Sequence, residues 1–189
     1  MAPKFSRTRS LRLKSSKIGP YLQACNTARI KEMRHSKPSF EINKSKVENL
    51  RIALVSAEWN KGYNLEMLES AREELIAQGL DAENIDEYTV PGAFEIPLMA
   101  LKLADTDAYD AIIVFATVIK GATIHFELVA SESTRGIMTA SLDTEIPIIN
   151  GILACNTEEQ AEERASRSKE DKGKELALSC LQLCSELPN

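Results

Sequence analysis

Four short runs of apolar residues without a helical period divide the chain from residue 51 onward. They are residues 51–56, 84–90, 110–119 and 146–153, and the third run is the most apolar of the four. Aliphatic and β-branched residues in runs of this length predict buried β-strands. Because the runs are apolar on nearly every position, they are typical of a parallel sheet that is covered on both faces.

Segments with helical periodicity separate and follow these strands. They are residues 63–79, 93–105, 125–143, 157–167 and 174–187. Pro97 is compatible with the second of them only in its first turn, and Thr157 opens the fourth with a capping-box pattern. Alternation of strands and helices predicts an α/β fold, a three-layer sandwich in which helices cover both faces of a four-stranded parallel sheet.

The two parts of the chain carry opposite charges. Residues 1–50 hold 12 Lys and Arg against three Glu, whereas residues 51–189 hold 11 Lys and Arg against 25 acidic residues. Residues 1–38 are rich in Arg, Lys and Ser and lack the apolar core of a secretory signal, so we expect a basic arm or an organelle transit peptide there and a folded domain over 39–189. A basic arm also attracts polyanions, but no groove-reading motif accompanies it, and we expect no specific nucleic-acid partner.

Composition narrows the class of protein further. A chain of 189 residues with 43% hydrophobic and 27% charged residues has the mix of a soluble globular domain. No run reaches the roughly 18 apolar residues of a membrane-spanning helix, so no membrane partner is expected. The four Cys form no CxxC motif and there are only two His. We therefore expect no disulfide framework and no metal site, and an intracellular location in the cytoplasm or an organelle.

Ligands of parallel sheets bind beyond the carboxyl ends of the strands, where loops lead into the N-termini of helices. Four loops of this chain are expected at that edge of the sheet. They are Ala57–Tyr63, Pro91–Glu95, Thr117–His125 and Asn150–Thr157.

The loop after the third strand carries the most chemistry. Gly121 leaves room for close backbone approach, and the N–H groups of Ala122 and Thr123 are placed to hold an anion before a helix. His125 follows in the first helical turn, where the positive end of the helix dipole favours a neutral, proton-accepting imidazole. From the residues alone, His125 is either an acid–base group or a capping or packing residue.

Three further residues have two interpretations each. Glu95, at a helix N-terminus, is either a partner of the helix dipole or an acceptor for the hydroxyls of a polyol. Trp59, the only Trp of the chain, either packs in the fold or stacks on a heteroaromatic ligand. Arg164 lies in a very acidic helix and, taken alone, indicates a surface ion pair.

Four motifs in one register resemble a known family. VPGAFEIP, VIKGATIHFELV, PIINGIL and EEQAEERA are similar to the lumazine synthases over about residues 40–187. The resemblance implies flavodoxin-like winding of the sheet, no metal or redox cofactor, and a homopentamer or higher homo-oligomer, up to an icosahedral shell, with active sites between subunits. The implied reaction condenses 5-amino-6-(D-ribitylamino)uracil with 3,4-dihydroxy-2-butanone 4-phosphate to 6,7-dimethyl-8-ribityllumazine, the penultimate step of riboflavin biosynthesis.

The resemblance also assigns roles to individual residues. It makes His125 the general acid and base, and Trp59 the aromatic residue that stacks on the pyrimidine ring. The other implied substrate-binding positions are Ala93, Phe94 and Glu95 for the ribityl chain, Val118 and Ile119 for the uracil edge, Gly121, Ala122 and Thr123 for the phosphate, and Lys172. Arg164 is implied to reach the phosphate from a neighbouring subunit.

Three positions depart from the family pattern. Asn150 stands where an aromatic residue is usual, Ser168 replaces a basic residue, and Ala116 replaces a glycine. Loss of one ring contact costs about 0.5–1.5 kcal/mol, so weaker binding rather than lost binding is expected. These departures keep an alternative open, a weakened or inactive relative that acts as an oligomeric shell or scaffold, or as a lumazine- or flavin-binding protein.

Overall fold

The computed structural model describes residues 42–187 of the chain. Its centre is a four-stranded sheet in the order β2-β1-β3-β4, with every neighbouring pair parallel. The strands are β1 (Ile52–Ala57), β2 (Ile85–Val90), β3 (Ala111–Ile119) and β4 (Ile148–Cys155). This arrangement confirms the predicted four-stranded parallel sheet and its flavodoxin-like winding.

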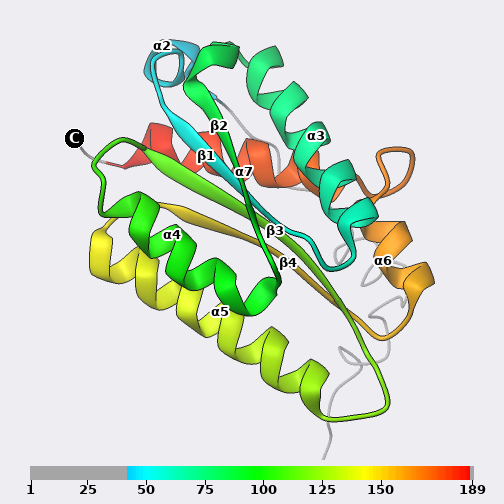
Figure 1. Ribbon diagram of the computed structural model, residues 1–189. Coiled ribbons are helices and arrows are strands. Elements are labelled where there is room, and N and C mark those ends of the chain that lie inside the picture. Colours follow the sequence, from blue (N-terminus) through cyan, green and yellow to red (C-terminus); the bar gives the residue numbers. More distant parts are fainter. Residues whose placement is uncertain (1–41, 188–189) are drawn as a thin grey trace, which may run out of the picture. The chain divides into compact units, whose positions relative to one another are not determined.

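Helices form the two outer layers of the sandwich (Figure 1). They are α2 (Lys44–Val47), α3 (Lys61–Ala77), α4 (Ile96–Ala104), α5 (His125–Thr144), α6 (Glu158–Ala165) and α7 (Lys172–Glu186), with short 3₁₀ turns η2 (Ala82–Asn84) and η3 (Ala93–Glu95). Residues of α4 and α5 share one buried cluster with one face of the sheet, and residues of α3, α6 and α7 share a second cluster with the other face. The α/β three-layer prediction is confirmed.

Alternation along β1 explains why both layers form. All six residues of this strand are buried. Ile52 and Leu54 pack with α3 and α7, whereas Ala53 and Val55 pack with α4 and α5. Burial of apolar surface on both sides stabilises the sheet at about 25 cal/mol per Å² removed from water.

The structure corrects several boundaries. β4 begins at Ile148 and continues to Cys155, because its ladder with β3 runs on through the pair Ile119↔Cys155. Asn150 lies within the strand, opposite Val114, as the predicted strand has it, so the loop expected over Asn150–Thr157 begins only after Cys155. The second predicted helix begins with the η3 turn, with Pro97 in the first turn of α4 as expected.

Other expectations have mixed outcomes. Thr157 caps α6 by accepting from the N–H of Gln160, whose side chain in turn accepts from the N–H of Asn156. The predicted boundary between residues 38 and 39 lies outside the described residues.

Cys180 is buried and Cys184 half-buried, and both are free thiols. Within residues 42–187, no helix combines the length and the apolar character needed to cross a membrane.

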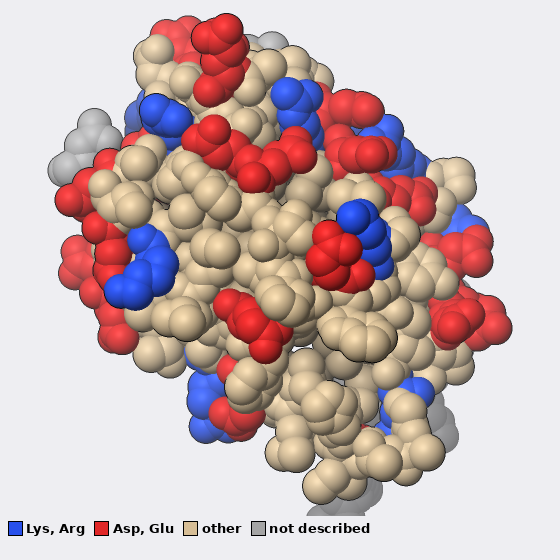
Figure 2. Space-filling model, in the orientation of Figure 1, with Lys and Arg blue, Asp and Glu red and all other residues tan. Residues whose placement is uncertain are grey.

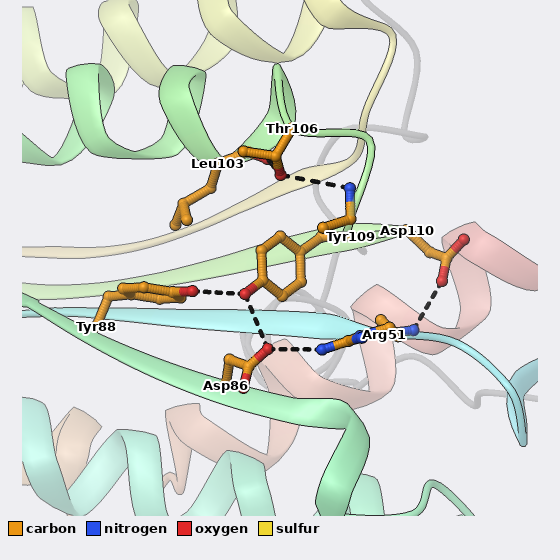
Figure 3. Close-up of polar contacts among 8 residues, drawn as sticks. Arg51, Asp86, Tyr88, Leu103, Thr106, Tyr109 and Asp110 are labelled. Carbon is orange, nitrogen blue, oxygen red and sulfur yellow. Dashed lines mark hydrogen bonds and ion pairs between the residues drawn. The ribbon is translucent and has the colours of Figure 1, made fainter.

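A polar network ties the amino ends of three strands together (Figure 3). Arg51 donates to Asp86 at 3.0 Å, and the Tyr109 hydroxyl donates to the same carboxylate oxygen at 2.8 Å. Because the one hydroxyl proton of Tyr109 goes to Asp86, the Tyr88 hydroxyl is the donor in its 2.6 Å contact with Tyr109. The backbone N–H of Arg51 donates to Asp110 at 2.7 Å. The network lies at the sheet edge opposite to the candidate loops.

Candidate active site

A pocket of about 810 Å³ opens at the carboxyl ends of β1 and β3. The chain order changes direction between these two strands, since β1 continues outward to β2 and β3 to β4. Loops that leave such a switch point diverge and leave a crevice, the usual ligand site of open α/β sheets. The candidate residues that line the pocket are Trp59, Ala93, Phe94, Glu95, Val118, Ile119 and His125.

Trp59 lies in the turn between β1 and α3. Its side chain is 76% exposed, so the interpretation as a packed core residue is wrong. The turn is held against the next loop, because the N–H of Glu58 donates to Val90 O at 2.9 Å and that of Trp59 to Pro91 O at 3.2 Å. An exposed indole at the mouth of an apolar pocket is available for stacking on a flat ligand.

Glu95 and Trp59 approach the same glycine. A methyl group at Gly92 would lie 3.1 Å from Glu95 Oε2 and 3.3 Å from Trp59 Cδ1. Gly92 is thus the small residue that lets a carboxylate and an aromatic ring meet at one side of the pocket. Neighbouring Phe94 is 60% exposed and adds apolar surface to the same wall.

His125 is the first residue of α5 and lines the same pocket. Its backbone N–H donates to Thr123 Oγ1 at 3.4 Å. An ion pair between Lys120 Nζ and Glu127 Oε1, 2.8 Å apart, joins the two ends of this loop, and Lys120 Nζ also lies 5.8 Å from the centre of the Phe126 ring. The hydrogen bond from Lys120 lowers the pKa of Glu127 below its usual value. The ion pair is a tether for the loop that carries the imidazole.

Residues 121–123, predicted to hold an anion, form the exposed rim beside His125. No atom lies within 4 Å of the position that a side chain at Gly121 would occupy. A ligand can therefore approach the backbone at Gly121 without meeting another side chain. An anion at these N–H groups remains a prediction.

Besides the rim residues 121–123, three predicted site residues do not line this pocket within one chain, namely Arg164, Lys172 and Asn150. Arg164 lies on α6, with Nη1 3.8 Å from Glu170 Oε2, and Lys172 forms an ion pair with Glu175. Burial raises the pKa of the Cys155 thiol, and nearby Arg164 opposes that shift. The Asn150 side chain, exposed on β4, accepts from the N–H of Ile152 at 3.0 Å.

The pocket also contains residues that sequence reasoning missed. Asn60, Leu128, Val129 and Glu132 line it, the last three from α5. The helical period would have revealed these three, because positions three, four and seven residues after His125 share its face of the helix. Asn60 carried no such signal, since its φ of 60° and its bond to Thr117 O appear only in the folded turn.

The chemical groups of the pocket suit a flat, hydroxylated ligand. It combines an aromatic ring, a carboxylate and an imidazole on mainly apolar walls, the general pattern of small-molecule sites. Within residues 42–187, no three His, Cys, Asp or Glu side chains are grouped in a way that would hold a metal ion.

Comparison with known proteins places these residues in a family. Residues 49–187 match the family model described as 6,7-dimethyl-8-ribityllumazine synthase. A protein of Nitrosospira multiformis named 6,7-dimethyl-8-ribityllumazine synthase is 44% identical over 138 residues, which cover 73% of this chain and 84% of the relative. The matched residues 49–187 include every element that lines the pocket. The chain belongs to the 6,7-dimethyl-8-ribityllumazine synthase family.

Proposed function

We propose that the pocket between Trp59 and His125 is the active site of a lumazine-forming transferase. As a member of its family, the chain acts in riboflavin biosynthesis and condenses a ribitylamino-uracil with a four-carbon keto phosphate. One observation carries the site assignment. Trp59, Glu95 and His125 follow three different strands, β1, β2 and β3, and line a single pocket at the switch point of the sheet.

The pyrimidine substrate fits the aromatic side of this pocket. The exposed Trp59 indole stacks on the ring, and the backbone of Val118 and Ile119 pairs with the uracil edge. The ribityl chain runs toward Phe94 and Glu95, where the carboxylate accepts hydrogen bonds from its hydroxyls. Ala93 lines the same end of the pocket.

His125 transfers protons during the condensation. The amino group of the pyrimidine attacks the ketone carbon and water leaves, which forms an imine. Phosphate then leaves by elimination, and the ribityl-bearing nitrogen closes the second ring with loss of a second water. Each step moves a proton between nitrogen, carbon or oxygen, and a positioned imidazole accelerates such transfers by roughly 10²–10⁴-fold.

The phosphate group needs cations that one chain does not bring to its own pocket. The exposed N–H groups of residues 121–123 hold one side of the phosphate. Arg164 and Lys172 of a neighbouring copy supply positive charge on the other side, and Asn150 of that copy contacts the pyrimidine. This division of the site explains why the three residues lie outside the pocket of their own chain.

An uncovered apolar surface supports assembly with further copies. Figure 2 shows a mostly uncharged surface over α4 and α5, interrupted by single acidic and basic side chains. The large apolar side chains exposed on η3, α4, α5 and the turn before α5 are Phe94, Leu98, Ile124, Leu128, Met138 and Leu142. Apolar surface on this scale marks an interaction site. A homopentamer, alone or within an icosahedral shell, covers this surface and brings Arg164 to its neighbour's pocket.

Formation of the lumazine product tests the proposal. Purified protein is mixed with the ribitylamino-uracil and the keto phosphate, and product is followed by its absorbance and fluorescence, beside His125→Ala and Arg164→Ala. We expect a rate far above the uncatalysed background that falls in both variants by at least about tenfold. A background rate from the intact oligomer would instead favour the scaffold or flavin-binding alternative.

The location proposed for the protein is intracellular, in the cytoplasm, or in an organelle if residues 1–38 act as a transit peptide. A fluorescent-protein fusion with and without these residues distinguishes the two. Residues 1–38 are a targeting segment if their removal returns the fusion to the cytoplasm.

A further inference from the structure

The Trp59 ring is not held in place by its own packing. With 76% of the side chain exposed, few atoms surround it. The position of the ring therefore depends on the backbone of the turn that carries it. On one side, the N–H of Trp59 donates to Pro91 O at 3.2 Å. The contacts on the other side of the turn come from two asparagine side chains.

The side chain of Asn64, at the start of helix α3, binds the backbone of the turn between β1 and α3. Its side chain is fully buried, and its Nδ2 donates to Ala57 O at 2.7 Å and to Trp59 O at 2.8 Å. An amide nitrogen has two protons to donate, so both are used on this one turn. The two accepting carbonyls stand at the end of β1 and at Trp59 itself.

Asn60 adds a connection to the neighbouring strand. Its backbone adopts the left-handed conformation, with φ of 60° and ψ of 36°, which Asn tolerates better than most residues. Its Nδ2 donates to Thr117 O at 2.7 Å, at the end of β3. The turn is thereby attached to the strand that leads to the His125 loop.

The unused atom of Asn64 indicates what the side chain is for. Its Oδ1 is buried and has no hydrogen-bond partner among the described residues. A buried acceptor without a partner lowers the stability of the fold. An asparagine at this position therefore indicates that the two hydrogen bonds donated by its nitrogen offset that loss. Those donors make contact only with the Trp59 turn.

We propose that Asn64 is a positioning residue that sets the place of the Trp59 ring over the pocket. If the turn were released, the ring would sample other positions, and only the fraction of molecules with the ring in place would bind the flat substrate well. The part of this inference that concerns substrate rests on the proposed function. The link between Asn64 and the ring does not depend on it.

Asn64→Leu tests the link, because leucine has a similar size but no proton to donate. Asn64→Ser keeps one donor and is the milder variant, used also if the first fails to fold. Ser70→Ala is the matched control, since Ser70 is buried on the same helix and donates to Asp171 at 2.5 Å, away from the turn. Trp59 is the only Trp, so time-resolved fluorescence anisotropy of the intact oligomer reports on this ring alone.

We expect larger rapid motion of Trp59 in Asn64→Leu, an intermediate value in Asn64→Ser, and the parent value in Ser70→Ala. The KM for the ribitylamino-uracil should rise about 3–10-fold in Asn64→Leu, with kcat and the KM for the keto phosphate within about twofold. Unchanged anisotropy in both Asn64 variants, or a change of equal size in Ser70→Ala, would overturn the inference.

Trp59→Ala separates failure of this inference from failure of the proposed site. If Trp59→Ala leaves the KM for the ribitylamino-uracil unchanged, the ring does not stack on that substrate and the site assignment is wrong. The anisotropy comparison still decides whether Asn64 holds the ring. If Trp59→Ala raises this KM and the Asn64 variants leave it unchanged, the ring matters and the positioning role is refuted.

Discussion

At the scale of single residues, the shape of the pocket depends on a glycine and on an ion pair in the loops that surround it. Gly92 lets Glu95 and Trp59 approach each other, and the tether between Lys120 and Glu127 joins the two ends of the loop that carries His125. None of these contacts is strong alone, because an ion pair exposed to solvent adds little to stability. Their value lies in holding reactive groups in one arrangement before substrate binds.

Asn150 gives the first prediction at this scale. Its side chain is exposed, accepts a hydrogen bond from Ile152 of its own strand, and has no aromatic surface to offer the ligand of the proposed site. We expect Asn150→Phe to tighten binding of the ribitylamino-uracil by up to about tenfold, equivalent to one ring contact of about 0.5–1.5 kcal/mol. Isothermal titration of the oligomer measures the change. Unaltered affinity would place Asn150 outside the active site, and Asn150→Leu controls for added apolar area.

At the scale of elements, close packing decides where α7 lies. A methyl group at Gly173 would lie 2.1 Å from Met67 O, so the first turn of α7 rests directly on the backbone of α3. No side chain larger than hydrogen fits there without moving one helix. This contact also sets the place of Lys172, the residue before it.

Gly173→Ala should therefore lower the free energy of unfolding by about 1–3 kcal/mol or more, through overpacking against backbone. Gly62→Ala on α3 is the matched control. No atom lies within 4 Å of its added methyl group, and helix propensity predicts a gain of about 0.5–1 kcal/mol. Urea unfolding measures both. Equal effects of the two substitutions would contradict the close approach of α3 and α7.

The network at the amino ends of the strands gives a pH prediction. Burial, followed by the hydrogen bonds with Tyr88 and Asp86, raises the pKa of Tyr109 above its ordinary value of 10.0. The unfolded chain then loses this proton at lower pH than the folded chain does. The contribution to stability is complete below pH 10 and is lost as the pH rises further.

We expect the free energy of unfolding to fall as the pH rises from about 9.5 to 11, and to fall less steeply in Tyr109→Phe. Urea unfolding at several pH values measures the slope. Tyr88→Phe keeps the bond between Tyr109 and Asp86 and should retain most of the slope. Parallel curves for Tyr109→Phe and the parent would show that Tyr109 is not the group responsible.

At the scale of the whole molecule, one chain does not bring all residues of the proposed site to its own pocket. His125 lines the pocket, whereas Arg164 and Lys172 lie on the helices that follow β4. A site completed by a neighbour can be tested without a structure of the assembly. Each site would take His125 from one subunit and Arg164 from the next.

Mixed oligomers of His125→Ala and Arg164→Ala should therefore regain activity. In closed rings with random mixing at equal amounts, about one quarter of the sites combine an intact His125 with an intact Arg164. We expect about a quarter of the parent activity after the two variants are unfolded and refolded together. Mixing without subunit exchange is the control, and no recovery after verified co-assembly would place both residues in one chain's site.

The apolar and polar pattern determined the layers of this protein. The strand of residues 51–56 was predictable because it buries side chains on both faces, which leaves a continuous apolar run in the sequence. The position of the glycine-containing loop before His125 followed from the same pattern, since loops after parallel strands meet at one edge. The motifs then indicated the family, because four of them stand in one register.

Only the tertiary structure decided how the parts meet. Whether Trp59 packs or stays exposed depends on which surfaces remain near the end of β1, and its short sequence neighbourhood does not contain that information. The end of β4 at Cys155 depended on the hydrogen-bond ladder with β3, which continues past the apolar run of residues 146–153. The bonds of Asn64 to the Trp59 turn join residues only five and seven apart, but they form only in the folded geometry of the turn. The separation of Arg164 from His125 is a relation between different elements. The periodicity of a sequence determines which side of an element is buried, whereas distances between elements arise only when the whole chain packs.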